Sequence, residues 1–246
     1  MKQSTKTFFG LVAIYAVLAA ASIYFPQINS NFVQQSLPAA KSIMALAIFG
    51  VIIIAYGGLG FLGLKLASKI SIPDILDKSV SNKQRFVLSG IAGAACGIIL
   101  IIADNILNRF NGIGHFAHPD FPVSILAAIS AAIGEEIIFR LFFISFWTWL
   151  ISKIILRGKF QNKIFWAISV FSAIAFGIAH YPAIMYLYGF SSFAAMPLAL
   201  HAELIALNGL IGIVAAYFYK KSGYLGAVSV HLWADIIWHV FYGFFV

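Results

Sequence analysis

The stretch Gly134-Glu135-Glu136-Ile137-Ile138-Phe139-Arg140 places two carboxylates and an arginine inside an apolar run over residues 121–151. Each ionisable group near a bilayer centre costs on the order of 3 kcal/mol, so a chain that keeps three of them so close together has a use for them. On a helix, Glu136 and Arg140 lie one turn apart on one face, whereas Glu135 points about 100° away from Glu136. The pattern predicts a structural ion pair and a second, working carboxylate. The alternative is an ion-pair network that only fixes helix packing.

Composition defines the class of protein. The chain has 246 residues, of which 62% are hydrophobic and 10% charged, whereas soluble domains carry about 25% charged residues. We therefore predict an all-α, polytopic membrane bundle. The net charge of +8 does not indicate nucleic-acid binding, because the basic residues lie mostly in short loops. A single cysteine, Cys96, excludes an internal disulfide and a zinc site built on cysteines.

About seven transmembrane helices are expected, and glycines in the second and third allow close contact with neighbouring helices. The expected spans are residues 8–25, 40–66, 86–103, 121–151, 164–180, 198–219 and 224–245. The first is interpreted as an uncleaved helix rather than a signal peptide. The segment 181–197, broken by prolines and glycine, is expected to form an extended loop or a partly re-entrant segment.

The loop charges predict the orientation. Thirteen of the sixteen lysines and arginines fall before the first span, within residues 65–85 and 153–163, and at 220–221. The opposite loops hold only Lys41 and Arg109. Because cytoplasmic loops are enriched in lysine and arginine, we expect a cytoplasmic N-terminus and an outer C-terminus. The expected location is a prokaryotic plasma membrane.

Three further ionisable residues fall in or beside spans: His180, His231 and Asp235. His231 and Asp235 are four residues apart and share a helix face, as do Phe176 and His180. Such groups must face the bundle interior or a wet cavity, because lipid offers them no partners. They are therefore expected to gather around Glu135. A single buried histidine is more often a packing residue, but this set on three helices favours chemistry.

Two kinds of chemistry suit these side chains. A glutamate separated from its ion partner can act as a general base on water, with one histidine positioning the water and another stabilising an oxyanion. Alternatively, the histidines and carboxylates bind a divalent metal such as zinc, beside which the glutamate acts as the base. Both arrangements describe hydrolysis of an amide bond.

Three motifs in order resemble the CAAX-processing and bacteriocin-immunity family of intramembrane proteases, called CPBP or Abi. Its patterns are Glu-Glu-x-x-x-Arg, Phe-x-x-x-His and His-x-x-x-Asn or Asp. Here they read Glu135-Glu136-Ile-Ile-Phe-Arg140, Phe176-Gly-Ile-Ala-His180 and His231-Leu-Trp-Ala-Asp235. The resemblance covers residues 123–244, so we divide the chain into N-terminal helices (1–120) and a catalytic core (121–246) within one membrane unit.

The resemblance implies a conical bundle with a water-filled cavity open to the membrane. It implies that Glu135 activates water with His180, and that His231 and Asp235 bind the oxyanion or a metal. Glu136 and Arg140 would hold the site together. The candidate metal ligands are Glu135, His180, His231 and Asp235. Many members end the last motif with asparagine; Asp235 cannot donate to an oxyanion unless protonated, which favours a metal-binding or histidine-orienting role.

We therefore expect an intramembrane endopeptidase that is surrounded by lipid and acts on a membrane-associated peptide or protein. Two rivals stay open: a non-catalytic scaffold or bacteriocin-immunity protein of the same fold, and a proton-coupled transporter. His201 and Glu203 either line the cavity or lie at the membrane interface, and the interface is favoured. The oligomeric state and the depth of His180 relative to the other site residues stay open.

Overall fold

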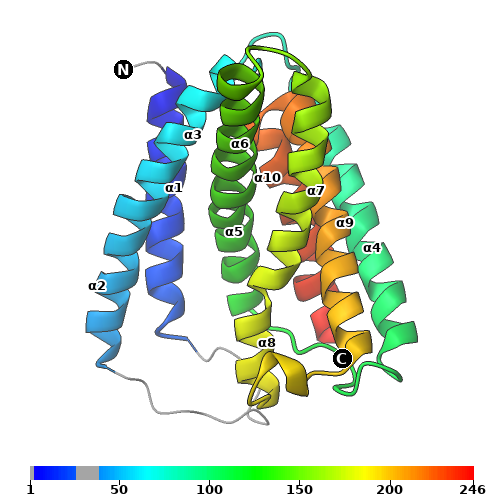
Figure 1. The fold of residues 1–246 in the computed structure, drawn as a ribbon. Helices are drawn as coiled ribbons and strands as arrows, with labels where there is room; N and C mark the ends of the chain where they lie inside the picture. Colours follow the sequence, from blue (N-terminus) through cyan, green and yellow to red (C-terminus); the bar gives the residue numbers. More distant parts are fainter. Residues whose placement is uncertain (1–2, 26–38) are drawn as a thin grey trace.

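The computed structural model describes residues 3–25 and 39–246, and every regular element within them is a helix (Figure 1). The helical segments join into seven continuous stretches. They are α1 (Gln3–Ser22); α2 (Lys41–Val51) with η1 (Ile52–Tyr56) and α3 (Gly57–Lys69); η2 (Lys83–Leu88) with α4 (Ser89–Leu107); α5 (Val123–Glu136) with η3 (Ile137–Ile144), α6 (Ser145–Thr148) and η4 (Trp149–Ile155); α7 (Gln161–Ala179) with α8 (Tyr181–Tyr188); α9 (Leu198–Ser222); and α10 (Tyr224–Asp235) with η6 (Ile236–Phe241) and η7 (Tyr242–Phe244). The predicted all-α bundle is confirmed.

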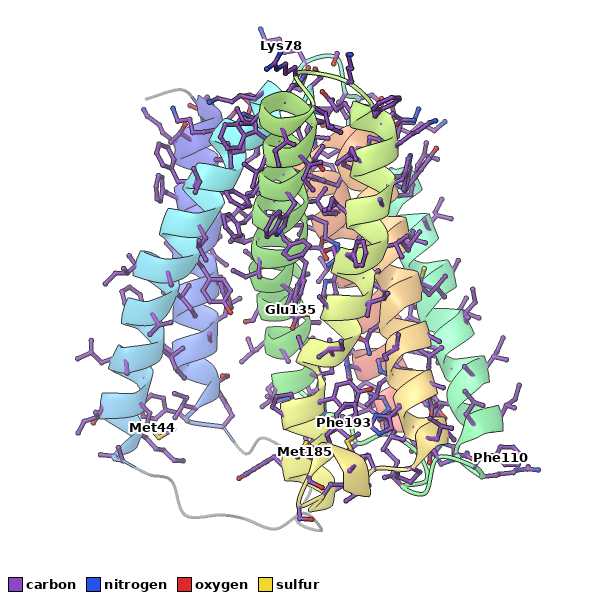
Figure 2. All side chains as sticks on the ribbon, viewed as in Figure 1. Met44, Lys78, Phe110, Glu135, Met185 and Phe193 are labelled. Atoms are coloured by element: carbon purple, nitrogen blue, oxygen red, sulfur yellow. The ribbon has the colours of Figure 1, made fainter. Side chains whose placement is uncertain are left out.

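Five of these stretches are long and apolar enough to cross a membrane: Gln3–Ser22, Lys41–Lys69, Lys83–Leu107, Gln161–Tyr188 and Leu198–Ser222. The other two, residues 123–155 and 224–244, carry the acidic pair and the last histidine motif. Large apolar side chains such as Ile54 and Leu46 are exposed on the outer surface, where lipid would cover them (Figure 2). The chain is an integral membrane protein, and the number of spans and the sidedness of its termini stay predictions.

The segment after α7 differs from the extended loop that was one expectation. The chain turns at His180 and forms the short helix α8, followed by the 3₁₀ turn η5 (Phe193–Ala195). Pro182 lies in the first turn of α8, where a missing backbone N–H leaves no hydrogen bond unmade. The proline therefore starts a new helix, and apolar residues of the segment lie on that helix.

The main hydrophobic core fills the half of the bundle that lies between the acidic pair and the basic loops. Ile137, Leu141 and Ile144 follow one another at helical spacing and are almost fully buried. They pack with Tyr219 and Tyr224, which are also buried. The Tyr224 hydroxyl donates a hydrogen bond to the Ile133 carbonyl (2.8 Å), so the core also ties α10 to α5.

Glycines bring helices into backbone contact where the sequence predicted close packing. At Gly93 on α4, an added Cβ would overlap the carbonyl of Val230 on α10. Gly63 on α3 lies equally close to the Leu141 backbone. Gly58, by contrast, faces open space. The contact at Gly93 matters most for the site, because it holds α4 against the helix that carries His231.

We predict that Gly93→Ala lowers the free energy of unfolding by about 1–3 kcal/mol, because the methyl group must displace the α10 backbone. The matched control is Gly58→Ala, which adds a methyl group in open space and favours the helix by about 1 kcal/mol. Thermal unfolding of both variants in one detergent measures the difference. Equal midpoints for the two variants would contradict the close α4–α10 contact.

Candidate active site

The acidic pair lies where α5 continues into η3. Glu136 and Arg140 are both fully buried, and Glu136 Oε1 lies 3.0 Å from Arg140 Nη1. The guanidinium group also lies over the ring of Phe176 on α7, 4.8 Å from its centroid. Arginine stays charged in proteins, and an unpaired buried charge costs several kcal/mol. Glu136 therefore neutralises a charge that the bundle cannot otherwise hold.

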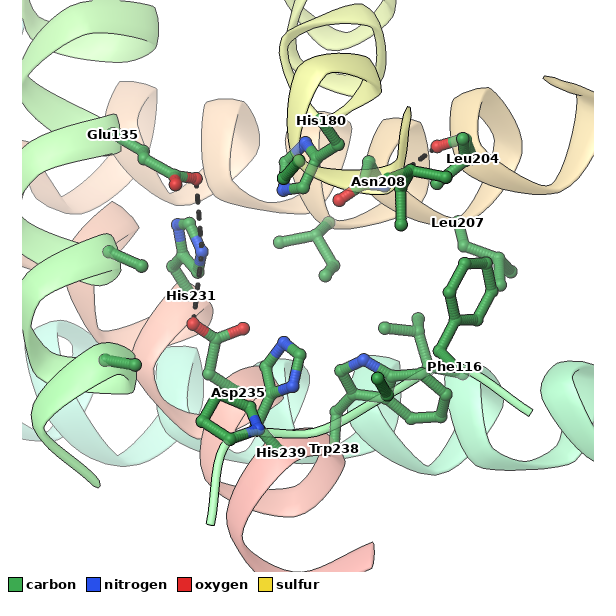
Figure 3. Close-up of a pocket in the computed structure, with 18 of the residues that line it drawn as sticks. Phe116, Glu135, His180, Leu204, Leu207, Asn208, His231, Asp235, Trp238 and His239 are labelled. Carbon is green, nitrogen blue, oxygen red and sulfur yellow. Dashed lines mark hydrogen bonds and ion pairs between the residues drawn. The ribbon is translucent and has the colours of Figure 1, made fainter. Parts of the chain in front are cut away.

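His231 on α10 joins this pair to the other two carboxylates. Its Nδ1 lies 2.9 Å from Glu136 Oε1. Its Nε2 lies 3.8 Å from Glu135 Oε2 and 3.5 Å from Asp235 Oδ2 (Figure 3). Both ring nitrogens thus face carboxylates, Nδ1 at hydrogen-bond distance and Nε2 at ion-pair distance. The first and third motifs form one connected cluster on two helices.

Glu135 differs from Glu136 in its surroundings although the two are neighbours in sequence. The Glu135 side chain is 35% exposed, whereas that of Glu136 is 0% exposed. Successive residues on a helix point about 100° apart, so one carboxylate enters the core and the other enters a cavity. In Figure 3 the Glu135 side chain points towards His231 at the edge of this cavity. Glu135 is the carboxylate that water can reach.

His180 lies at the turn between α7 and α8, and its own helix orients its ring. His180 Nδ1 lies 2.8 Å from the carbonyl oxygen of Phe176, one turn earlier. If Nδ1 donates this hydrogen bond, Nε2 is left as a proton acceptor. The Phe176 ring packs edge-on against both His180 (5.0 Å between centroids) and His231 (5.5 Å).

The depth of His180, which the sequence left open, matches that of Glu135. His180 follows the start of α7 at Gln161 by nineteen residues, and Glu135 precedes the end of η4 at Ile155 by twenty. At about 1.5 Å per residue, both lie roughly 30 Å from the same end of the bundle. The long helix 123–155 ends four residues beyond the predicted span, which ended at residue 151.

A cavity of about 260 Å³ connects these groups. Glu135, His180, His231 and Asp235 all line it (Figure 3). Most of the remaining wall is apolar and comes from α4, α5, α8, α9 and the loop before α5: Leu100, Ala127, Ala131, Ala183, Ile184, Leu187, Leu204, Leu207, Ile211, Phe116, Ala117 and Pro119. A polar group at one end of a mostly apolar pocket is the usual form of a small-ligand or substrate site.

The loop 108–122 forms part of the cavity wall because a buried carboxylate holds it. Asp104 at the end of α4 is fully buried. It accepts hydrogen bonds from the Tyr242 hydroxyl (2.9 Å) and the Phe116 backbone N–H (3.2 Å), and it lies 2.5 Å from His115 Nδ1. The sequence indicated only that His115 and His118 were solvated loop residues. Burial lowers the pKa of His118, which packs on Trp238, to about 4.

Glu203 is a cavity residue that sequence reasoning placed at the membrane interface. Its exposed fraction is 2%, and its Oε2 accepts a hydrogen bond from Asn111 Nδ2 (2.9 Å). Its other oxygen makes no hydrogen bond within the described residues. The available signal was the cost of a carboxylate within an apolar helix, which requires an internal partner. Asn208, Trp238 and His239 also line the cavity, and apolar periodicity does not single them out.

The structure does not gather all four candidate metal ligands into one metal-binding group. Within residues 3–25 and 39–246, no group of three or more histidine, cysteine, aspartate or glutamate side chains is arranged to hold an ion. Glu135 and Asp235 each face His231 Nε2, at 3.8 and 3.5 Å, whereas His180 Nδ1 is directed to the Phe176 carbonyl.

Comparison with known proteins adds one finding. A family model described as type II CAAX prenyl endopeptidase, Rce1-like, matches residues 117–244, which is more than half of the chain. The matched region contains all three motifs, whereas Leu100, Asp104, Asn111, His115 and Phe116 lie before it. No curated protein and no solved structure matches the chain.

We predict that Arg140→Met destabilises the protein by about 3–5 kcal/mol, because it leaves Glu136 buried without its partner. The matched control is the double variant Glu136→Gln, Arg140→Met, which removes both charges and recovers part of the loss. Thermal unfolding in detergent measures both. A double variant that is no more stable than Arg140→Met would mean that shape, not charge pairing, sets the cost.

Proposed function

Because the chain belongs to the Rce1-like family of type II CAAX prenyl endopeptidases, we propose that it hydrolyses a peptide bond in a membrane-associated peptide or protein. The family is one of intramembrane proteases, which confirms the resemblance drawn from the three motifs. The observation that carries the proposal is the unequal burial of the acidic pair. Glu136 is buried and contacts Arg140 and His231 through Oε1, whereas Glu135 faces the cavity that His180 and His231 also line.

Glu135 acts as the general base. A water molecule in the cavity attacks the carbonyl carbon of the substrate while the Glu135 carboxylate takes its proton. His180 Nε2 accepts a hydrogen bond from the same water, because Nδ1 is occupied by the Phe176 carbonyl. This pair of acceptors from two helices orients the attacking oxygen. The surrounding apolar wall excludes other water and strengthens each electrostatic contact.

The developing oxyanion is stabilised at His231. As the carbonyl double bond becomes a single bond, its electron pair moves to oxygen, and the His231 Nε2–H donates to that oxygen. Glu136 accepts from Nδ1 and fixes the ring, and Asp235 beside Nε2 favours the proton there. The tetrahedral intermediate then collapses. The carbon–nitrogen bond breaks, and the proton held by Glu135 passes to the leaving amine.

The rival functions use the same residues differently. A scaffold or immunity protein would need the buried Glu136–Arg140–His231 contacts but not the partly exposed Glu135. A proton-coupled transporter would need Glu135 to bind and release protons during transport. Substitution of Glu135 therefore separates the proposed peptidase from the scaffold, and detection of new peptide termini separates it from the transporter.

We predict that Glu135→Gln abolishes cleavage, with a rate loss of at least about 10²–10⁴-fold, because an amide cannot take a proton from water. The assay is mass spectrometry of products from a library of membrane peptides incubated with purified, reconstituted protein. Thermal unfolding checks that the variant is folded. Equal product profiles for wild type and variant would exclude Glu135 as the base, and intact peptides in both samples would favour the scaffold.

A separate prediction concerns Asp235. Asp235→Asn is expected to reduce the cleavage rate by less than about tenfold, because its amide keeps an acceptor for His231 and adds a donor for the oxyanion. Asp235→Leu, of similar size without polar atoms, is expected to lose about 10²-fold. Comparable losses in both variants, with both folded, would show that the negative charge itself is required.

A further inference from the structure

The described basic residues gather at one end of the bundle. They lie at the start of α1 (Lys6), within residues 65–85 and 153–163, and at the end of α9 (Lys220 and Lys221). Lys78 marks this end in Figure 2. At the opposite end, marked there by Met44 and Phe110, the described lysines and arginines are Lys41 and Arg109. The helix hairpins of the structure thus keep the charge asymmetry that the sequence showed.

The cavity lies towards the end that carries few basic residues. Its wall includes Phe116, Ala117 and Pro119 of the loop before α5, and Ala183 and Leu187 of α8. Both segments lie at the end opposite Lys78 (Figures 1 and 2). Glu135 is at the inner end of this space, about 18 Å from the start of α5 by helical rise.

The path from Glu135 to the basic end is filled. Within about two helical turns after Glu135 come the fully buried Glu136–Arg140 pair and then Leu141 and Ile144. Tyr219 and Tyr224 close the same layer; the Tyr219 hydroxyl lies 2.6 Å from Ser145 Oγ. A substrate cannot pass these side chains without unfolding the core. A peptide must therefore reach Glu135 from the other end or from the lipid beside it.

Cytoplasmic loops are the ones enriched in lysine and arginine. We infer that the cavity takes its substrate from the extracytoplasmic side of the membrane, so that the peptide bond cut is in an exported peptide or on the outer flank of a membrane helix. This inference rests on the proposed peptidase function. It assigns to this chain a substrate class that excludes the cytosolic tails of prenylated proteins.

The charges of the cavity wall also restrict which substrate segments can bind. The wall carries three carboxylates, those of Glu135, Glu203 and Asp235, and the described lining includes neither lysine nor arginine. Glu203 offers a buried oxygen without a hydrogen-bond partner among the described residues. An acidic segment or a free C-terminal carboxylate would find no lysine or arginine there to pair with its charge. The segment that fits is apolar and neutral or basic.

The orientation is tested first, without reference to activity. Asp120→Cys and Lys78→Cys each place a cysteine at an exposed position at opposite ends. Whole cells expressing each variant are treated with a maleimide that does not cross the cytoplasmic membrane. We expect labelling at position 120 and not at 78, and wild type, whose Cys96 is buried, is the matched control. The reverse labelling pattern would overturn the inference.

The side of cleavage is tested with one segment in two positions. The probe is whichever member of the membrane-peptide library purified wild type cuts fastest in detergent, where both ends are accessible. The segment is fused next to a single anchor helix, on the outer side of the membrane in one fusion protein and on the cytoplasmic side in the other. Each fusion protein is coexpressed with wild type or with Glu135→Gln. We expect Glu135-dependent cleavage of the outer fusion only.

The outcomes separate the two proposals. Cleavage of the cytoplasmic fusion, alone or together with the outer one, defeats the inference about sidedness and leaves the peptidase intact. Cleavage in detergent of no library member defeats the peptidase and this inference with it. Cleavage in detergent of acidic segments as fast as basic ones defeats the argument from wall charge, while the two fusions still decide the side.

Discussion

The Glu136 carboxylate is the group on which the rest of the site depends. It is buried, it faces Arg140 at 3.0 Å on its own helix, and it faces His231 at 2.9 Å on α10. One negative charge thus compensates a guanidinium and positions an imidazole. The guanidinium in turn contacts Phe176 on α7, so the three helices that carry the three motifs meet around one carboxylate. Loss of this charge would affect packing and chemistry together.

Helical geometry explains why one of the two adjacent glutamates is buried and the other faces the cavity. A single residue step turns the side chain by about 100°, which is enough to bury one carboxylate and leave the other at a cavity. The adjacent pair therefore allows His231 to contact a structural carboxylate through Nδ1 and a working carboxylate through Nε2.

Much of this arrangement could be predicted from the chain alone. The i, i+4 relation of Glu136 and Arg140 and the inward placement of His231 follow from helical periodicity and from the cost of charge in lipid. The roles of Asp104 and Glu203 could not be predicted, because they depend on contacts between distant segments. Asp104 meets Tyr242 across 138 positions, and Glu203 meets Asn111 across 92. Local patterns contain no information on such pairs.

The hydrogen bond from His180 to the Phe176 carbonyl stays within α7, whereas the contacts of His231 with Glu135 and Glu136 join two helices. The ion pairs among Glu135, Glu136, Arg140, His231 and Asp235 involve only the long helix 123–155 and α10. A small slide of α7 along its axis would therefore leave these ion pairs with their partners and change the gap across which His180 faces Glu135. The width of that gap decides whether a single water molecule can contact both residues.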